Sequence, residues 1–121
     1  MVRRPWDRAS DAHPLAVRDV PALDAMRILR ALARRRRYKY VAPRVEPEGD
    51  GWKIVSPNCS RRIDPRGGQI DIAWLVPRAA GGWLLYARDH AQRSWRLVLG
   101  AETLAPLLDQ VCLDPQREFW P

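Results

Sequence analysis

Cysteine and histidine are both scarce in this sequence, which has two of each among its 121 residues. Neither Cys59 nor Cys112 lies at the short spacing from a second cysteine or a histidine that zinc ligands show. The sequence therefore predicts no metal site and no cofactor. It favours two free thiols, which is the usual state of cysteine in a reducing cytoplasm.

Long apolar runs are also missing. The sequence has no stretch of about 18 apolar residues that could form a membrane-spanning helix, and residues 1–14 lack the apolar segment of a signal peptide. With 46% hydrophobic and 29% charged residues, the composition is that of a globular protein. We therefore expect a single domain located in the cytoplasm.

Acidic residues are absent from one stretch in particular. From Arg27 to Arg44 there are eight basic residues and no acidic one, whereas the whole chain has 21 basic and 14 acidic residues. Without this stretch, 13 basic and 14 acidic residues remain, so the net charge falls from +7 to −1. The basic character of the protein is therefore a local feature, and it calls for a local explanation.

The order of the segments predicts one domain behind an N-terminal arm. Residues 1–20 combine prolines with mixed charges, which predicts an irregular arm, and residues 21–121 are expected to form a single domain. A helix is predicted to begin at Pro21 and to end in the arginine cluster. Its expected buried stripe follows helical spacing and consists of Ala22, Ala25, Met26, Leu29, Leu32 and Ala33.

Alternating apolar residues predict the strands of a sheet. They lie at residues 38–46, 52–55, 70–76, 83–88 and 95–99. Because the connections are mostly short, we expect the strands to be antiparallel. A second helix is expected from Thr103 to Asp114, followed by an aromatic tail that docks on the sheet or on a second copy of the chain. The predicted fold class is α+β: an antiparallel sheet of about five strands packed against two helices.

The tryptophans and one aspartate give further expectations about the sheet. Four tryptophans fall on predicted strands and are expected to share one buried face: Trp52, Trp74, Trp83 and Trp95. Trp6 and Trp120 lie outside the strands and are expected at the surface or at an interface. Asp71 is expected to face solvent or to pair with an arginine such as Arg88.

The basic stretch is the first candidate site. Arginine and lysine side chains on a helix face, beside two tyrosines, suit phosphate contacts and stacking on bases. We therefore predict a small basic module that binds nucleic acid. The expected contact residues are Arg27, Arg30, Arg34, Arg35, Arg36, Arg37, Tyr38, Lys39 and Tyr40. The alternative is a protein–protein adaptor or regulator that binds an acidic partner through the same surface, and a homodimer also stays open.

The polar loop between the second and third predicted strands is the other candidate. Its backbone and its arginines could hold an anion or contact a partner through Asn58, Cys59, Ser60, Arg61, Arg62 and Arg66. The alternative is an ordinary turn-rich connection. Cys59 could act as a nucleophile only with a base beside it, such as His90 or His13. No spacing in the sequence indicates such a pair, so we expect no enzymatic activity.

The C-terminal third carries a set of spaced aromatic and apolar residues. These are Trp83, Tyr86, Arg88, Asp89, Trp95, Leu104, Leu107, Val111, Asp114, Phe119 and Trp120. In this pattern the segment resembles a family of small uncharacterised bacterial proteins, a domain of unknown function. The resemblance implies a compact bacterial α+β domain. It implies no activity, because none is attached to the family.

Overall fold

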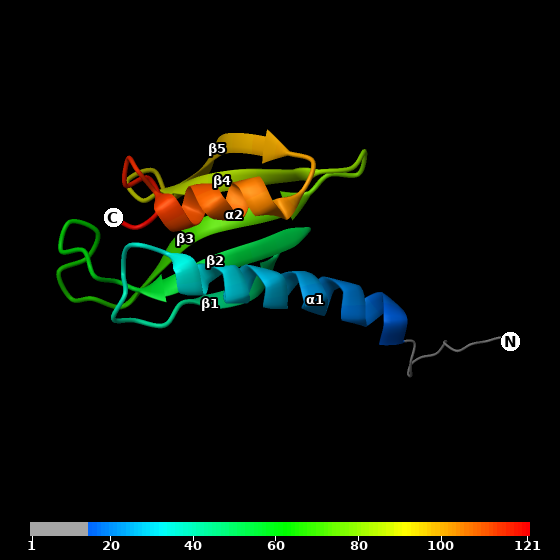
Figure 1. Ribbon diagram of the computed structural model, residues 1–121. Coiled ribbons are helices and arrows are strands. Elements are labelled where there is room, and N and C mark those ends of the chain that lie inside the picture. The colour runs from blue at the N-terminus through cyan, green and yellow to red at the C-terminus, as the bar shows by residue number, and fades with distance from the viewer. Residues whose placement is uncertain (1–14) are drawn as a thin grey trace, which may run out of the picture.

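The computed structural model describes residues 15–121, with side chains described from Leu23 onward, and shows a five-stranded sheet with two helices (Figure 1). The elements are α1 (Leu15–Ala31), the short 3-10 turn η1 (Leu32–Arg34), β1 (Arg44–Glu48), β2 (Gly51–Pro57), β3 (Gln69–Pro77), β4 (Trp83–Asp89), β5 (Ser94–Ala101) and α2 (Leu104–Leu113). The strands lie in the order β1-β2-β3-β4-β5, and every neighbouring pair is antiparallel. The predicted α+β fold is confirmed.

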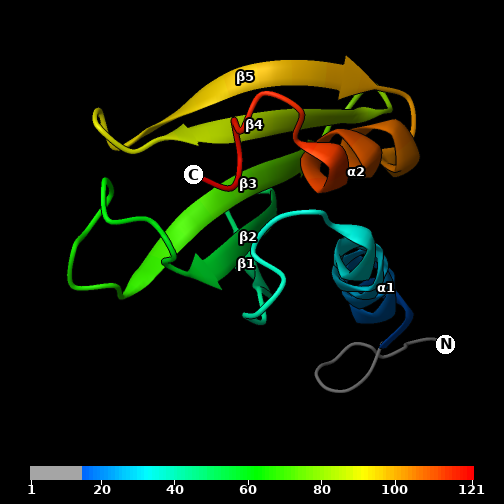
Figure 2. The same cartoon turned by 60° about the vertical axis from the view of Figure 1, so that its left-hand side comes forward.

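Both helices lie on the same face of the sheet, while no helix of the described chain covers the other face (Figure 2). The core fills the space between the two layers. It is built from α1 (Ile28), from η1 (Leu32), from the inner face of the sheet (Ile54, Ile72, Leu75, Leu85), from α2 (Leu107, Val111) and from the tail (Phe119, Trp120). No helix within residues 15–121 is both long and apolar enough to cross a bilayer.

The first helix begins earlier than the sequence predicts. It starts at Leu15, so residues 15–20, which were assigned to the arm, form its first turns, and Pro21 lies inside the helix. Proline there removes only one helical hydrogen bond, and the residues before it are compatible with a helix. The rest of the predicted arm, residues 1–14, lies outside the described residues.

The buried face of α1 differs from the predicted stripe. Ile28 and Leu32 are almost completely buried, whereas Met26 and Leu29 are 55% and 49% exposed. Apolar residues occur around most of this helix, so two stripes fit helical spacing equally well. Ile28, Ala31 and Leu32 are buried in the core, and Leu32 is the member of the predicted stripe for which burial is confirmed. The predicted members Met26, Leu29 and Ala33 are exposed.

The segment after α1 is a loop where the sequence predicts a strand. The strand β1 begins only at Arg44, and Tyr38 has a backbone φ of 58°, in the left-handed region that a strand cannot contain. Pro47 is accommodated within β1 because this strand is at the edge of the sheet. The predicted strand over residues 38–46 is therefore wrong for residues 38–43.

A β-bulge redistributes the tryptophans between the two faces of the sheet. Ile54 pairs with Ala73 and Val55 with Asp71, which leaves Ile72 as an extra residue in β3. The alternation is reversed beyond this point, because a bulge shifts the following side chains to the opposite face. The prediction of one buried tryptophan face is consequently wrong. Trp52 and Trp83 pack against the core, whereas Trp74 lies on the open face, with ring centroids 5.1 Å from Tyr86 and 5.7 Å from Trp95.

The aromatic tail is folded into the core. Phe119 and Trp120 are 1% and 0% exposed, so the predicted docking on the chain itself is confirmed and the expected surface position of Trp120 is wrong. Asp114, which ends α2 in the left-handed conformation, turns the chain back toward the sheet. The tail therefore lies beside the loop that follows α1. Both candidate regions of the sequence, the basic stretch and the polar loop before β3, come close to the tail.

Candidate functional site

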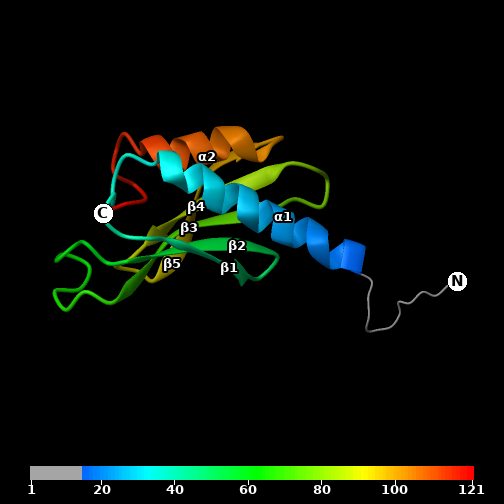
Figure 3. The same cartoon turned by 60° about the horizontal axis from the view of Figure 1, so that its bottom comes forward.

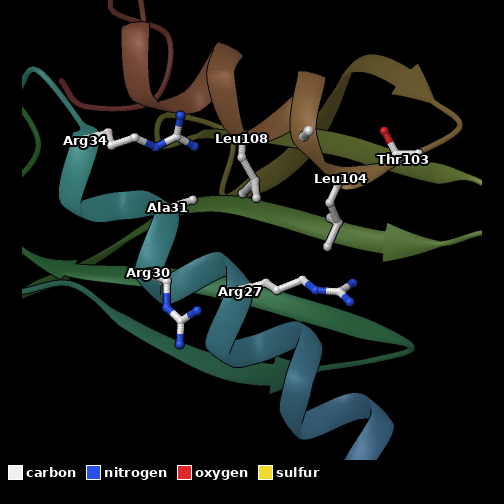
Figure 4. A pocket seen from close by; sticks show the side chains of 8 residues that line it. Arg27, Arg30, Ala31, Arg34, Thr103, Leu104 and Leu108 are labelled. Atoms are coloured by element: carbon white, nitrogen blue, oxygen red, sulfur yellow. The ribbon is translucent and has the colours of Figure 1, made fainter.

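The helices α1 and α2 lie side by side on one face of the sheet (Figure 3), and a groove runs between them (Figure 4). Its volume is about 680 Å³, and its floor is mainly apolar. Ala31 on α1 is small, and the leucines of α2 opposite it, Leu104 and Leu108, are buried at 7% and 5% exposure and form part of the floor. The residues that line the groove are Arg27, Arg30, Ala31, Arg34, Thr103, Leu104, Ala105 and Leu108.

Arginines from α1 and η1 form one rim of this groove. The side chains of Arg27 and Arg34 extend toward α2, while Arg30 points away from it (Figure 4). Arg34 reaches Asp109 of α2, with Nη1 and Oδ1 3.4 Å apart, and Arg27 lies 3.5 Å from Asp24 on its own helix. Each of these pairs is at the surface and contributes little to stability. Both arginines can therefore exchange their present partner for another carboxylate at small cost.

The solvent side of α1 continues the apolar character of the groove. Leu23, Met26 and Leu29 are each about half exposed, and they lie on the same side of the helix as Arg30. A surface helix normally presents polar residues to water. We call the groove together with these three residues the α1 surface, and it combines apolar area with positive charge.

Arg35 has an internal role instead of the predicted contact with nucleic acid. Its side chain donates hydrogen bonds to the carbonyl oxygens of Leu32, Tyr38 and Val41, and its guanidinium lies 5.6 Å from the centre of the Trp120 ring. Only 8% of the residue is exposed. Arg35 therefore holds the loop after α1 in shape and is not available to a phosphate.

Other members of the predicted surface are also engaged within the protein. Arg37 donates from Nε and Nη2 to the carbonyl of Asp114, at 3.1 and 3.0 Å. Tyr38 packs its ring 5.5 Å from that of Trp120, and Lys39 donates to the carbonyl of Arg35. The other members of the predicted set are exposed: Arg30, Arg36 and Tyr40, together with Arg27 and Arg34, whose side chains pair only with surface carboxylates.

The polar loop before β3 is held in a fixed shape by its own side chains. Asn58 accepts a hydrogen bond from the Ser60 N–H and donates to the carbonyls of Asp64 and Gly67. A second hollow, about 730 Å³, lies between this loop and the tail. Its lining includes Cys59, Ser60, Arg61 and Arg62 from the predicted set, and not Arg66.

The same hollow contains a residue that the sequence reasoning missed. Arg117 of the tail lines it together with the two loop arginines. The tail was interpreted from its aromatic residues alone, so the charge of Arg117 was not assigned to any site. Its position next to the proline-ended helix, where the chain turns back, is the only signal that the sequence offers.

The candidate nucleophile has no base beside it among the described residues. Cys59 is exposed, and its only hydrogen bond through sulfur, 3.9 Å long, is to the carbonyl of Pro57. His90 lies in a different hollow, next to Asp71 and Arg88, and burial together with the charge of Arg88 lowers the pKa of His90 below its ordinary value. His13 lies outside the described residues.

Asp71 is neutralised by two cations. Its carboxylate lies 3.4 Å from Lys53 and 3.7 Å from Arg88, so the predicted pairing with Arg88 is confirmed. Within residues 15–121, no three histidine, cysteine or carboxylate side chains lie together in a way that could hold a metal ion.

The two thiols should differ sharply in their reactivity. Cys112 is buried, donates to the carbonyl of Ala31 at 3.2 Å, and has a pKa that burial raises above the ordinary value of a thiol. Titration of the native protein with a chromogenic disulfide reagent should therefore detect one thiol per chain, and titration after denaturation should detect two. The Cys59→Ala variant should retain its fold and should show no reactive thiol in the native state. Reaction of both thiols at one rate in the native protein would contradict the burial of Cys112.

Comparison with known proteins gives one result. Neither a curated protein nor a solved structure matches the chain. A family model does match, and it covers residues 17–121, so the match extends far beyond the C-terminal third that carries the resemblance in the sequence. The chain therefore belongs to the family described as a domain of unknown function, DUF3024.

Proposed function

We propose that the protein is an adaptor that binds an acidic amphipathic helix of a partner protein on the α1 surface. The observation that carries this proposal is the apolar floor of the groove beneath an arginine rim. A helix with leucine-like residues on one face and carboxylates along their flank complements both features. Helices commonly bind to grooves of this kind through residues spaced three and four apart.

Magnitudes indicate which part of the surface supplies the affinity. Full burial of one leucine-sized side chain stabilises a complex by about 1.5–3 kcal/mol, whereas an exposed ion pair contributes about 0–1 kcal/mol. The apolar floor therefore provides most of the binding energy. The arginines select an acidic partner and accelerate its association.

The same geometry favours a protein partner over nucleic acid. Three of the predicted contact residues, Arg35, Arg37 and Tyr38, are engaged inside the protein. No aromatic ring lines the groove, and an apolar floor offers nothing to a phosphate. Base stacking, which provides much of the affinity for single strands, would be left to Tyr40 alone.

The proposal predicts charge-selective binding of a defined helical peptide. The probe is a synthetic 16-residue peptide with leucines at positions i, i+3, i+4 and i+7 and glutamates flanking them. We expect a Kd of about 10–100 μM at near-physiological salt, since burial of two leucines offsets the ordering of the peptide. The same peptide with lysine in place of glutamate should not bind. Isothermal titration calorimetry measures both.

Substitutions within the groove provide the matched controls. Ala105→Glu introduces a negative charge in the first turn of α2, where it suits the helix dipole and leaves the core intact. It should weaken binding of the acidic peptide at least tenfold, whereas the neutral Ala105→Gln should have little effect. The triple variant R27E/R30E/R34E should abolish binding, and R61E/R62E/R93E, with the same change in charge outside the groove, should not.

Nucleic acid is the competing outcome of this experiment. Short single- and double-stranded oligonucleotides are titrated under the same conditions. Binding tighter than about 100 μM, with a log–log salt slope of about −0.7 or −0.9 per phosphate contact, would support the nucleic-acid interpretation if the acidic peptide did not bind. The adaptor proposal would then be wrong.

A further inference from the structure

The hollow between the polar loop and the tail is formed by three segments far apart in the sequence. Tyr38, from the loop after α1, joins the other two: its hydroxyl accepts a hydrogen bond from the Cys59 N–H and donates one to the main-chain oxygen of Pro121. The distances are 3.3 and 3.1 Å. Tyr38 thereby holds the polar loop against the tail, and the hollow lies next to this junction.

Positive charge gathers around this hollow, and no acidic side chain is among the described residues that line it. Arg61, Arg62 and Arg117 line it, and none of them pairs with a carboxylate of the described residues. The nearest acidic residues of the tail are engaged elsewhere. Glu118 pairs with Arg96, and Asp114 accepts hydrogen bonds from the tail backbone.

Arg117 occupies a backbone conformation that costs free energy for any residue except glycine. Its φ is 54°, in the left-handed region, where a residue with a Cβ is less stable than glycine by about 1–2 kcal/mol. Fold stability alone would therefore favour glycine at this position. Arginine is nevertheless present here, and its side chain lines the hollow.

We infer that this hollow binds a phosphorylated small molecule, with the phosphate between Arg61, Arg62 and Arg117. Guanidinium groups bind phosphate through paired N–H donors, and three of them match a dianion better than a carboxylate. Ser60 belongs to the same lining, and a serine hydroxyl can donate a hydrogen bond to an anion. Ile63 and Pro121 provide apolar walls for the body of the ligand.

The dimensions of the hollow favour a small molecule over an extended polymer. A volume of about 730 Å³ lies within the range of ordinary ligand pockets, about 300–1,000 Å³. The hollow shares no residue with the α1–α2 groove. This inference is therefore independent of the proposed adaptor function, and each can fail without the other.

Phenyl phosphate serves as the probe, because it combines a phosphate with a compact apolar body. Calorimetric titration of the full chain at fixed ionic strength should give a Kd below about 1 mM. Arg117→Gly should weaken binding at least tenfold while the Tm stays equal or rises, since glycine relieves the left-handed strain. A purely structural Arg117 would lower the Tm instead. The double variant R61A/R62A should weaken binding to a similar extent.

Arg93→Gly is the matched control. Arg93 is likewise exposed and has a φ of 53°, but it lies in the turn between β4 and β5. This variant removes one arginine and the same strain, and it should leave the Kd within about twofold. An equal loss in Arg93→Gly and Arg117→Gly would show non-specific attraction and would overturn the inference.

Three further titrations identify the class of ligand. Benzoate and inorganic phosphate should each bind at least tenfold more weakly than phenyl phosphate, because one lacks the dianion and the other lacks the apolar body. Equal binding of either would contradict the assignment to a phosphomonoester. A phosphotyrosine tetrapeptide that bound more than tenfold tighter than phenyl phosphate would contradict the assignment to a small molecule.

Discussion

Replacement of Asp114 by alanine is expected to lower the free energy of unfolding by about 3–5 kcal/mol, the usual cost of removing one partner from a buried charged network. The side chain is 1% exposed. Its Oδ1 accepts hydrogen bonds from the N–H groups of Glu118 and Phe119, at 2.6 and 3.2 Å, and its Oδ2 accepts one from Trp120 at 2.9 Å. Alanine would leave all three donors without a partner.

The loss is increased by the charge that faces this carboxylate. The Nε of Arg37 lies 3.7 Å from Oδ2 of Asp114, and Arg37 also binds the Asp114 carbonyl. Without the carboxylate, the half-buried guanidinium of Arg37 loses the negative charge that balances its own. Alanine is also strained at the φ of 41° that Asp114 adopts, whereas asparagine tolerates such values. The Asp114→Asn variant should therefore be intermediate.

Urea denaturation followed by tryptophan fluorescence measures these differences. The control is Asp109→Ala, which removes an exposed carboxylate with a single arginine partner and should cost less than about 1 kcal/mol. If the Asp114→Ala midpoint shifted no more than that of Asp109→Ala, the buried network would not stabilise the tail. A variant that is unfolded without urea would agree with the expectation.

The order and type of the elements could be predicted because they depend on local patterns. Alternation gave the last three strands to within one or two residues, and leucine spacing gave α2. The faces of these elements could not be predicted in the same way. The extra residue Ile72 in β3 moved Trp74 to the open face, and bulges have no reliable signature in a single sequence. In α1, two apolar stripes competed, and only packing against the sheet selects Ile28.

The sequence predicts which residues belong to the candidate sites, but not how those residues are arranged in space. The arginine stretch is real, yet its members divide between the surface and the interior, because Arg35 and Arg37 donate hydrogen bonds to main-chain carbonyl groups at the ends of the two helices. The groove depends on α2, more than 60 residues away in sequence from Arg34. The contribution of Arg117 likewise depends on the return of the tail. Contacts between distant segments are not encoded in local periodicity.

Replacement of Trp120 by alanine is expected to cost about 3–5 kcal/mol, the scale of truncating a buried aromatic residue. Trp120 has no exposed surface, and its Nε1–H donates to the carbonyl of Val111 at 2.9 Å. Its ring also packs against Tyr38 and lies beneath the guanidinium of Arg35. The variant removes packing between the tail, α2 and the loop after α1, so all three should loosen together.

Hydrogen exchange can test this coupling directly. In Trp120→Ala, the N–H groups of Arg35, Arg36 and Cys59, which bond to the carbonyls of Leu32 and Cys112 and to the Tyr38 hydroxyl, should exchange faster. The N–H groups that pair β3 with β4 should exchange faster only to the extent that the variant has a lower global free energy of unfolding. Trp120→Phe keeps most of the packing and loses the bond to Val111, so it should cost only part of the alanine effect. Faster exchange confined to the tail would contradict the view that Trp120 joins the three segments, and it would leave the loop after α1 dependent on Arg35 alone.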